Sequence, residues 1–177
     1  MIELMSYYRD AELQGAALLL RLIRMMDDPD AQVKLALHLA DESRHAWLWT
    51  KRINDMGGEP MKIADGYQKR VSLRTVPRSI LEILALTVVV EERSFASYIE
   101  FIEHHQPEAA TLEVLKEITG DEKWHMAWIR KKLVEVARRE GDESLAEKAI
   151  EKFRRIDAEV YGELKAKEIE AFGDFVA

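Results

Sequence analysis

The chain contains no cysteine, which excludes disulfide bonds, cysteine-ligated zinc and iron–sulfur clusters and is consistent with a cytoplasmic location. It also has only four prolines and eight glycines in 177 residues, so long uninterrupted helices are favoured. Its most apolar run, Ile80 to Val90, is interrupted by Glu82 and is too short to span a bilayer. The first residues already carry Glu3 and Arg9, so we do not expect a signal peptide there.

The chain also lacks an excess of basic residues, with 26 lysines and arginines against 33 aspartates and glutamates. The net charge of −7 repels a phosphate backbone, so nucleic acid is not expected to be the main partner. What is present is 47% apolar and 33% charged residues, a composition typical of a folded globular protein. The length suits one domain with a sizeable core.

Apolar residues recur with the 3.6-residue period of helices, and no segment has the alternating pattern of a strand. Five helical segments are predicted, at about 3–26, 29–56, 77–105, 110–140 and 143–172, the last being one helix or two broken near Gly162. The connector at 57–77 is much longer than a tight turn between neighbouring helices.

This order of segments predicts an all-α fold. Two helices, a long crossover and two further helices have the connectivity of a ferritin-like four-helix bundle. We expect this bundle over residues 1–140. Residues 141–177 form a C-terminal helical extension whose amphipathic helix packs on its own bundle or on a partner subunit in a homodimer.

Two copies of one motif carry the chemistry. Asp-Glu-x-x-His occurs as "DESRH", with Glu42 and His45, and again 80 residues later as "DEKWH", with Glu122 and His125. The same offset places Glu12 of the first segment on Glu92, next to Glu91. The chain is therefore an internal repeat of helix pairs, each supplying one glutamate and one Glu-x-x-His.

Residues at i and i+3 share a helix face, so each Glu-x-x-His offers an oxygen and a nitrogen to one point in the core. Four carboxylates and two imidazoles suit two iron ions, with Mn/Fe or Mn/Mn as alternatives. The negative charges of the carboxylates balance two divalent cations, which offsets the cost of burying them.

Other residues are predicted around this centre. We expect Asp41 and Asp121 to accept hydrogen bonds from the histidine nitrogens that do not bind metal. His38 lies one turn before Glu42 and either approaches the site or is a core histidine, which is the commoner case.

Small and aromatic residues lie on the same helix faces as Glu12 and Glu91. Gly15 and Ala16 follow Glu12 by one turn and either leave room for dioxygen or a substrate or simply allow close helix packing. Tyr8 and Tyr98 are hydrogen-bond partners, redox-active groups or core residues.

Over roughly residues 1–140 the motifs resemble the ferritin-like diiron-carboxylate superfamily. "VEERSFASY" at 90–98 is similar to the third-helix segment of demethoxyubiquinone hydroxylases. Its Glu-x-Arg-Ser, like the Glu-x-Arg-His in "LADESRH", is similar to tRNA hydroxylases acting on an isopentenyl-adenosine derivative. Rubrerythrins also belong to this superfamily, but their cysteine-rich iron domain has no counterpart here.

The resemblance implies metal ligands at five positions and leaves the third segment to be decided. The five are Glu12, Glu42, His45, Glu122 and His125. In the third segment the repeat selects Glu92, whereas the family pattern selects Glu91; we favour Glu91, which lies on a continuous apolar stripe.

The expected function is that of an oxidoreductase whose catalysis is carried by the metal centre. A diiron oxygenase, such as a monooxygenase acting on a small organic substrate with dioxygen, is favoured. Because no nucleotide-binding glycine-rich loop is present, its electrons must come from an external donor. The alternatives are a rubrerythrin-like peroxidase, a ferritin-like ferroxidase and a non-catalytic helical interaction bundle.

Overall fold

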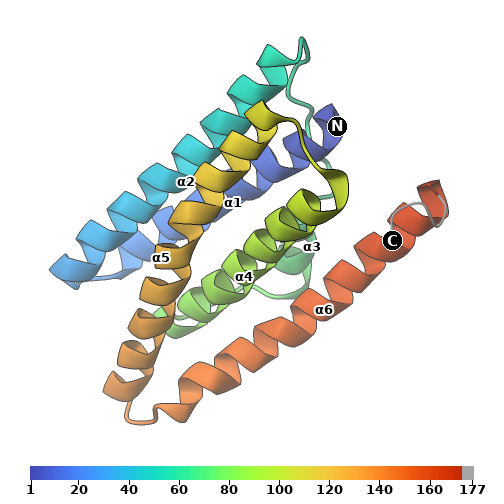
Figure 1. Cartoon of the computed structure of the whole chain (residues 1–177). Coiled ribbons are helices and arrows are strands. Elements are labelled where there is room, and N and C mark those ends of the chain that lie inside the picture. Colours follow the sequence, from blue (N-terminus) through green and yellow to red (C-terminus); the bar gives the residue numbers. More distant parts are fainter. Residues whose placement is uncertain (173–177) are drawn as a thin grey trace.

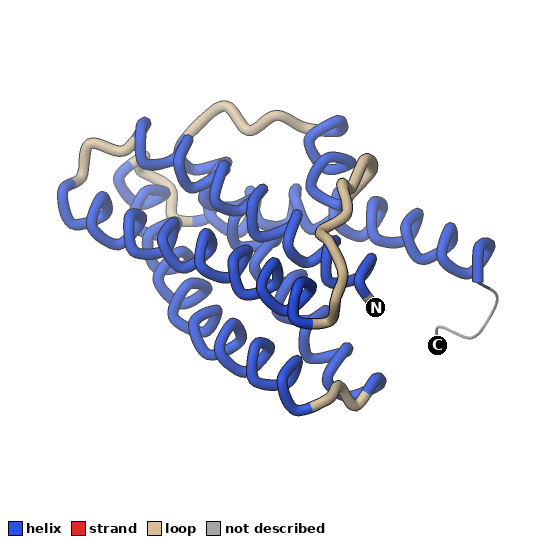
Figure 2. Tube along the Cα trace, turned by 90° about the horizontal axis from the view of Figure 1, so that it is seen from above, coloured by secondary structure: helices blue, strands red, loops and turns tan. Residues whose placement is uncertain are grey.

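The structure is a computed structural model that describes residues 1–172, with side chains as far as Lys165. Within that range all regular structure is helical (Figure 2), which confirms the all-α prediction. No helix in this part of the chain is apolar over a stretch long enough to cross a membrane. Residues 173–177 of the predicted extension lie outside the described residues. The helices are α1 (Ile2–Met25), α2 (Pro29–Asp55), α3 (Tyr67–Arg74), α4 (Ile80–His105), α5 (Ala109–Arg139) and α6 (Ser144–Phe172).

Local capping explains where the long helices begin and end. The Asp28 side chain accepts hydrogen bonds from the backbone N–H groups of Asp30 and Ala31, both at 3.1 Å, and Pro29 occupies the first turn of α2. Ser79 caps α4 in the same way through the N–H of Glu82. These caps satisfy N–H groups that have no partner inside the helix.

Four long helices form the bundle that holds the site. α1 packs against α2, α4 packs against α5, and the two pairs meet through α1 with α4 and α2 with α5 (Figure 1). The loops within each pair are short, whereas the connection from α2 to α4 covers residues 56–79. This long connection agrees with the predicted crossover.

The crossover contains the eight-residue helix α3, which was not among the five helical segments predicted from the sequence. Tyr67, Arg70 and Val71 bury the inner face of α3, which packs against α6 and α1. Their spacing is helical, but two turns within a mostly polar stretch give too short a pattern to recognise.

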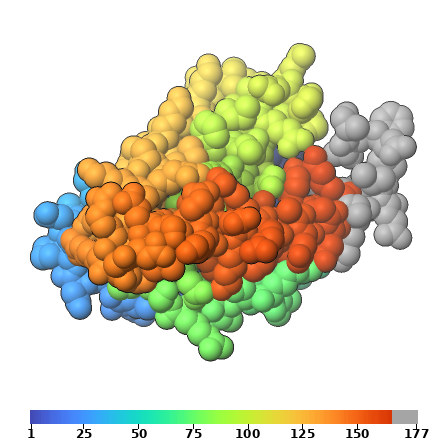
Figure 3. Space-filling model, turned by 90° about the horizontal axis from the view of Figure 1, so that it is seen from below, coloured from blue at the N-terminus to red at the C-terminus, as the bar shows by residue number. Residues whose placement is uncertain are grey.

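The C-terminal helix α6 lies along α4 and across the face shown in Figure 3. It continues through Gly162 as one helix. Its contact with the bundle is apolar through Ile150, Phe153 and Val160, all at most 3% exposed. Asp157 adds a polar anchor, which is described below.

Two apolar clusters lie at different heights in the bundle. One contains Leu22 of α1 and Leu35 of α2, and the other contains Met5 and Trp49 of the same two helices. The polar residues of the predicted site come between these clusters along each helix. A polar layer therefore divides the core of the bundle.

Candidate metal centre

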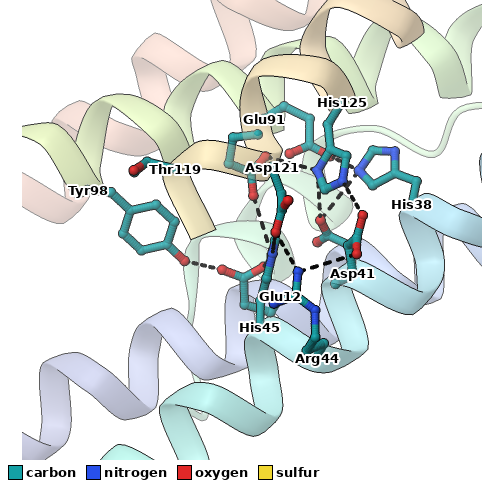
Figure 4. Close-up of polar contacts among 12 residues, drawn as sticks. Glu12, His38, Asp41, Arg44, His45, Glu91, Tyr98, Thr119, Asp121 and His125 are labelled. Carbon is teal, nitrogen blue, oxygen red and sulfur yellow. Dashed lines mark hydrogen bonds and ion pairs between the residues drawn. The ribbon is translucent and has the colours of Figure 1, made fainter. Parts of the chain in front are cut away.

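All six predicted ligands point into this polar layer, and none is more than 5% exposed. They come from all four bundle helices (Figure 4), and a seventh residue, His38 of α2, lies among them. The set consists of Glu12 from α1, His38, Glu42 and His45 from α2, Glu91 from α4, and Glu122 and His125 from α5.

The seven residues fall into two groups that share one carboxylate. In each group the donor atoms lie within 4.8 Å of one another, a spacing that can surround a single cation. Glu42 belongs to both groups, so the two cation positions are adjacent and share a ligand. The Glu12 subsite consists of Glu12, Glu42, His45 and Glu122, and the His38 subsite consists of His38, Glu42, Glu91 and His125.

The Nδ1 atoms of two histidines face the carboxylates. His45 Nδ1 lies 3.4 Å from Glu12 Oε2 and 3.6 Å from Glu122 Oε1. His125 Nδ1 lies 3.3 Å from Glu122 Oε2 and 3.6 Å from Glu42 Oε1. Nδ1 is therefore the atom that each ring presents to a cation.

The other ring nitrogen of each histidine, Nε2, is hydrogen-bonded to one of the two predicted aspartates. Each aspartate lies on the other helix from the histidine that it contacts, an arrangement called crossed below. Asp41 on α2 lies 3.2 Å from Nε2 of His125 on α5, and Asp121 on α5 lies 3.2 Å from Nε2 of His45 on α2. An aspartate in this place keeps the proton on Nε2 and leaves the Nδ1 lone pair free for metal.

Arg44 joins the two aspartates from outside. Its guanidinium donates to Asp121 and lies 3.4 Å from Asp41, and it also pairs with Glu117. The positive charge of the Arg44 guanidinium thus compensates the negative charges of both aspartates at the edge of the site.

The structure separates the two glutamates that the sequence left in competition. Glu91 lies in the cluster, whereas Glu92 points away from it and pairs with Arg130 and Arg154. One residue along a helix turns the side chain by about 100°, so only one of the two can face the core.

The two tyrosines lie beside the Glu12 subsite. The Tyr98 hydroxyl donates a hydrogen bond to Glu12 Oε1, and Tyr98 is 1% exposed (Figure 4). Burial and the Glu12 charge raise the pKa of Tyr98 well above its usual value. Tyr8 packs edge-on against Tyr98, with ring centroids 4.9 Å apart, and also against Trp49. Tyr98 therefore orients the Glu12 carboxylate, and Tyr8 packs against Tyr98 from the apolar side.

Gly15 lies against Glu42, between the centre and a surface pocket. A Cβ at this position would be 2.4 Å from Glu42 Oε2, so no larger residue fits without moving that carboxylate. Gly15 and Ala17, rather than Ala16, line a pocket of about 260 Å³ between α1, α3 and α4. Apolar residues such as Leu86 and Val90 make up much of its wall.

His38, for which the sequence left a site residue and the commoner core histidine as alternatives, lies among the carboxylates. It is fully buried, and its Nε2 lies 2.9 Å from Glu91 Oε1 and 3.4 Å from Glu42 Oε1. The sequence feature that points to this location is the position of His38 four residues before Glu42, which puts both on the same helix face. A single histidine at that spacing does not show by itself whether it faces carboxylates or apolar side chains.

The electrostatics of this layer indicate an excess of negative charge. Burial and the neighbouring carboxylates, Glu91 foremost, raise the pKa values of Glu42 and Glu122 well above the usual range. Burial lowers the pKa of His125 to about 4, helped by the adjacent His38. Burial also opposes a charge on His45, but Glu12 and Glu42 raise its pKa to about 9.

Several buried polar atoms of the cluster lack hydrogen-bond partners among the described residues. They are Glu42 Oε1, His45 Nδ1 and both ring nitrogens of His38. Such atoms are costly to bury unless something else compensates them. Two divalent cations would neutralise the four carboxylates and use these free lone pairs, so the donor set fits two ions of the iron or manganese type.

Comparisons with protein-family models, with curated proteins and with solved structures find no match to this chain.

Proposed function

We propose that the chain is a ferritin-like diiron-carboxylate oxidoreductase that activates dioxygen and oxidises a small, largely apolar organic substrate. The observation that carries the proposal is the pair of buried donor groups sharing Glu42. Four helices joined as two pairs by a long crossover, with one Glu-x-x-His in each pair, are typical of such proteins.

In a monooxygenase reaction, the substrate C–H bond and dioxygen yield an alcohol and water. Two electrons from an external reductase and two protons complete the balance. Two bound iron ions would supply the redox chemistry for reducing dioxygen. The carboxylates of Glu12, Glu42, Glu91 and Glu122 and the histidine nitrogens would hold these ions. The residues around them set orientation: Asp41 and Asp121 fix the histidine rings, and Tyr98 fixes Glu12.

The pocket beside Gly15 supports an organic substrate over iron oxidation alone. Its wall is largely apolar, and it is lined in part by Gly15, which lies against the Glu42 side chain. Arg21, which donates to the Pro77 carbonyl at 2.6 Å, also lines it. A chain that only oxidised Fe²⁺ would need a polar path for a hydrated cation rather than an apolar recess.

The test begins with anaerobic addition of Fe²⁺ to metal-free protein, followed by measurement of bound iron. We expect two ions per chain. Glu91→Gln should lower that number, whereas the neighbouring Glu92→Gln, which changes a carboxylate outside the cluster, should leave it at two. Absence of bound iron or manganese in the unaltered protein would contradict the proposal.

The choice of reaction is then tested by exposing the iron-loaded protein to dioxygen with a chemical reductant and a panel of small apolar compounds. Formation of a hydroxylated product supports the oxygenase. Repeated turnover of Fe²⁺ or hydrogen peroxide without any organic product would instead indicate the ferroxidase or peroxidase alternative.

A further inference from the structure

His38 has no counterpart in the second half of the internal repeat. The offset of 80 residues that superposes Glu42 on Glu122 places His38 on Ile118. Ile118 is fully buried in the apolar cluster that also contains Trp49 and Tyr98. The two halves of the centre therefore differ by one imidazole, on the side where His38 and His125 lie in Figure 4.

The surroundings of His38 are those of a ligand rather than of a hydrogen-bonded core histidine. Neither ring nitrogen has a hydrogen-bond partner among the described residues, although Nε2 is directed at Glu91 and Glu42. Its ring stacks on His125 with centroids 3.7 Å apart, and Trp124 packs edge-on at 5.7 Å. The ring nitrogen Nε2 therefore faces two carboxylates of the candidate site, 2.9 Å from Glu91 Oε1 and 3.4 Å from Glu42 Oε1, which is where a cation shared with those carboxylates would lie.

The extra imidazole makes the two subsites chemically unequal. The His38 subsite offers two imidazoles and two carboxylates, whereas the Glu12 subsite offers one imidazole and three carboxylates. Imidazole-rich sites suit iron and the later divalent metals, and carboxylate-rich sites suit manganese. Affinity at a given site also rises from Mn²⁺ to Fe²⁺, most clearly where nitrogen donors contribute.

We propose that His38 is a seventh metal ligand, so that the His38 subsite fills first and selects Fe²⁺ over Mn²⁺, while the Glu12 subsite accepts either ion. This inference rests on the two-metal centre proposed above. It predicts that, from a mixture of both metals, manganese enters only the Glu12 subsite, whereas the His38 subsite holds iron.

The test is an anaerobic calorimetric titration of metal-free protein with Fe²⁺ and with Mn²⁺. A crystal loaded from an equimolar mixture then locates each metal by anomalous diffraction at the iron and manganese edges. We expect two binding steps for Fe²⁺, with iron alone in the His38 subsite of the crystal and all of the bound manganese in the Glu12 subsite.

The decisive variant is His38→Ile, which copies the residue at the equivalent position of the repeat. We expect its first step to weaken by at least about tenfold for Fe²⁺, with the preference for iron lost. His38→Gln, which keeps a polar side chain, should show the same loss if the isoleucine variant does not fold. His105→Ala removes an exposed imidazole near the end of α4 and should leave both steps unchanged.

The outcomes separate this inference from the proposed function. If two ions bind with equal affinity, and if that affinity is unchanged in His38→Ile and His38→Gln, the proposed role of His38 is overturned while the two-metal centre stands. Failure of the unaltered protein to bind either metal would overturn both.

Discussion

Asp41 on α2 holds Nε2 of His125 on α5 at 3.2 Å, although the two residues are 84 positions apart in the chain. Asp121 and His45 repeat the contact in the opposite direction between the same two helices. Each Asp-Glu-x-x-His motif thus contributes candidate ligands to both subsites and gives its aspartate to the histidine of the other motif. The four residues tie α2 to α5 at the level of the metal centre.

We predict that Asp41→Asn weakens metal binding by about 10–100-fold, because the loss of the carboxylate lowers the basicity of His125 and loosens its orientation. The measurement is the dissociation constant for Fe²⁺ or Mn²⁺ under anaerobic conditions. Asp55→Asn is the control on the same helix, since among the described residues Asp55 pairs only with the exposed Lys51. Equal effects of the two substitutions would show that the aspartate acts on the fold rather than on the site.

Gly15→Ala is expected to impair the centre even though it adds only one methyl group. The new Cβ would be 2.4 Å from Glu42 Oε2 and must displace the carboxylate that both subsites share. We therefore expect less than two ions per chain and a smaller rise in melting temperature when metal is added. Both are measured by metal analysis and thermal unfolding.

Gly120→Ala is the matched control for this substitution. Gly120 also lies inside a bundle helix, two residues before Glu122, but a Cβ there meets nothing within 4 Å. We expect unchanged metal content and a gain of about 0.5–1 kcal/mol in the free energy of unfolding, because alanine favours the helix. Full metal occupancy in Gly15→Ala would refute the contact with Glu42.

Metal binding should release protons and should strengthen as the pH rises. The pKa values of Glu42 and Glu122 are raised by burial and by the charge of neighbouring carboxylates, so the metal-free protein retains protons that a cation must displace. Calorimetry in buffers of different ionisation enthalpy should show this release. Enthalpies independent of the buffer would contradict it.

The same pKa shifts set the sign of the pH dependence of stability. A carboxyl whose pKa is higher in the folded chain than in the unfolded chain stabilises the fold at low pH, and this stabilisation is lost as the pH rises through the folded value. In the acidic range Glu91 and His125 oppose this effect, because their pKa values are lowered to about 2 and about 4. Above neutral pH they no longer titrate, and the metal-free protein should lose stability as the pH rises, since His45, with its pKa raised to about 9, acts in the same sense as Glu42 and Glu122. Bound metal should reduce the loss, because the ions stabilise the carboxylates. Thermal unfolding of both forms across a pH series measures the difference.

Asp157 should anchor α6 to the rest of the molecule. Its carboxylate accepts hydrogen bonds from the Tyr67 hydroxyl of α3 at 2.7 Å and from Arg93 Nε of α4 at 2.9 Å. Asp157→Ala leaves both donors without this partner, and we expect a loss of about 2 kcal/mol in the free energy of unfolding. Chemical denaturation measures this loss.

The control for Asp157 is Glu100→Gln, which alters an exposed contact of α4 with Tyr161 and Lys165 of α6. Exposed pairs contribute little, so a change below about 0.5 kcal/mol is expected. A similar small effect in Asp157→Ala would show that apolar packing alone holds α6.

The all-helical fold and the residues of the cluster could be predicted from repeated sequence patterns. The features that depend on contacts between distant segments could not. Two Glu-x-x-His copies in register identified Glu42 and Glu122 because helical spacing alone puts each glutamate on the face of its histidine. The apolar stripe around Glu91 distinguished it from Glu92. By contrast, α3 was missed because its pattern spans only two turns.

The crossed aspartates and the setting of His38 could not be predicted from one segment. Asp41 contacts His125 only because α2 and α5 pack side by side at that height. His38 faces Glu91 because α4 brings that carboxylate to it. Neither distance is encoded in local spacing, so both required the three-dimensional structure.

The crossed aspartates also mean that neither helix pair is self-sufficient. The pair α1–α2 has its histidine oriented by Asp121, and α4–α5 has its histidine oriented by Asp41. A hairpin of this kind on its own could complete the arrangement only by pairing with a second copy of itself. With both hairpins in one polypeptide the two halves need not be identical, and they differ at His38 and Ile118.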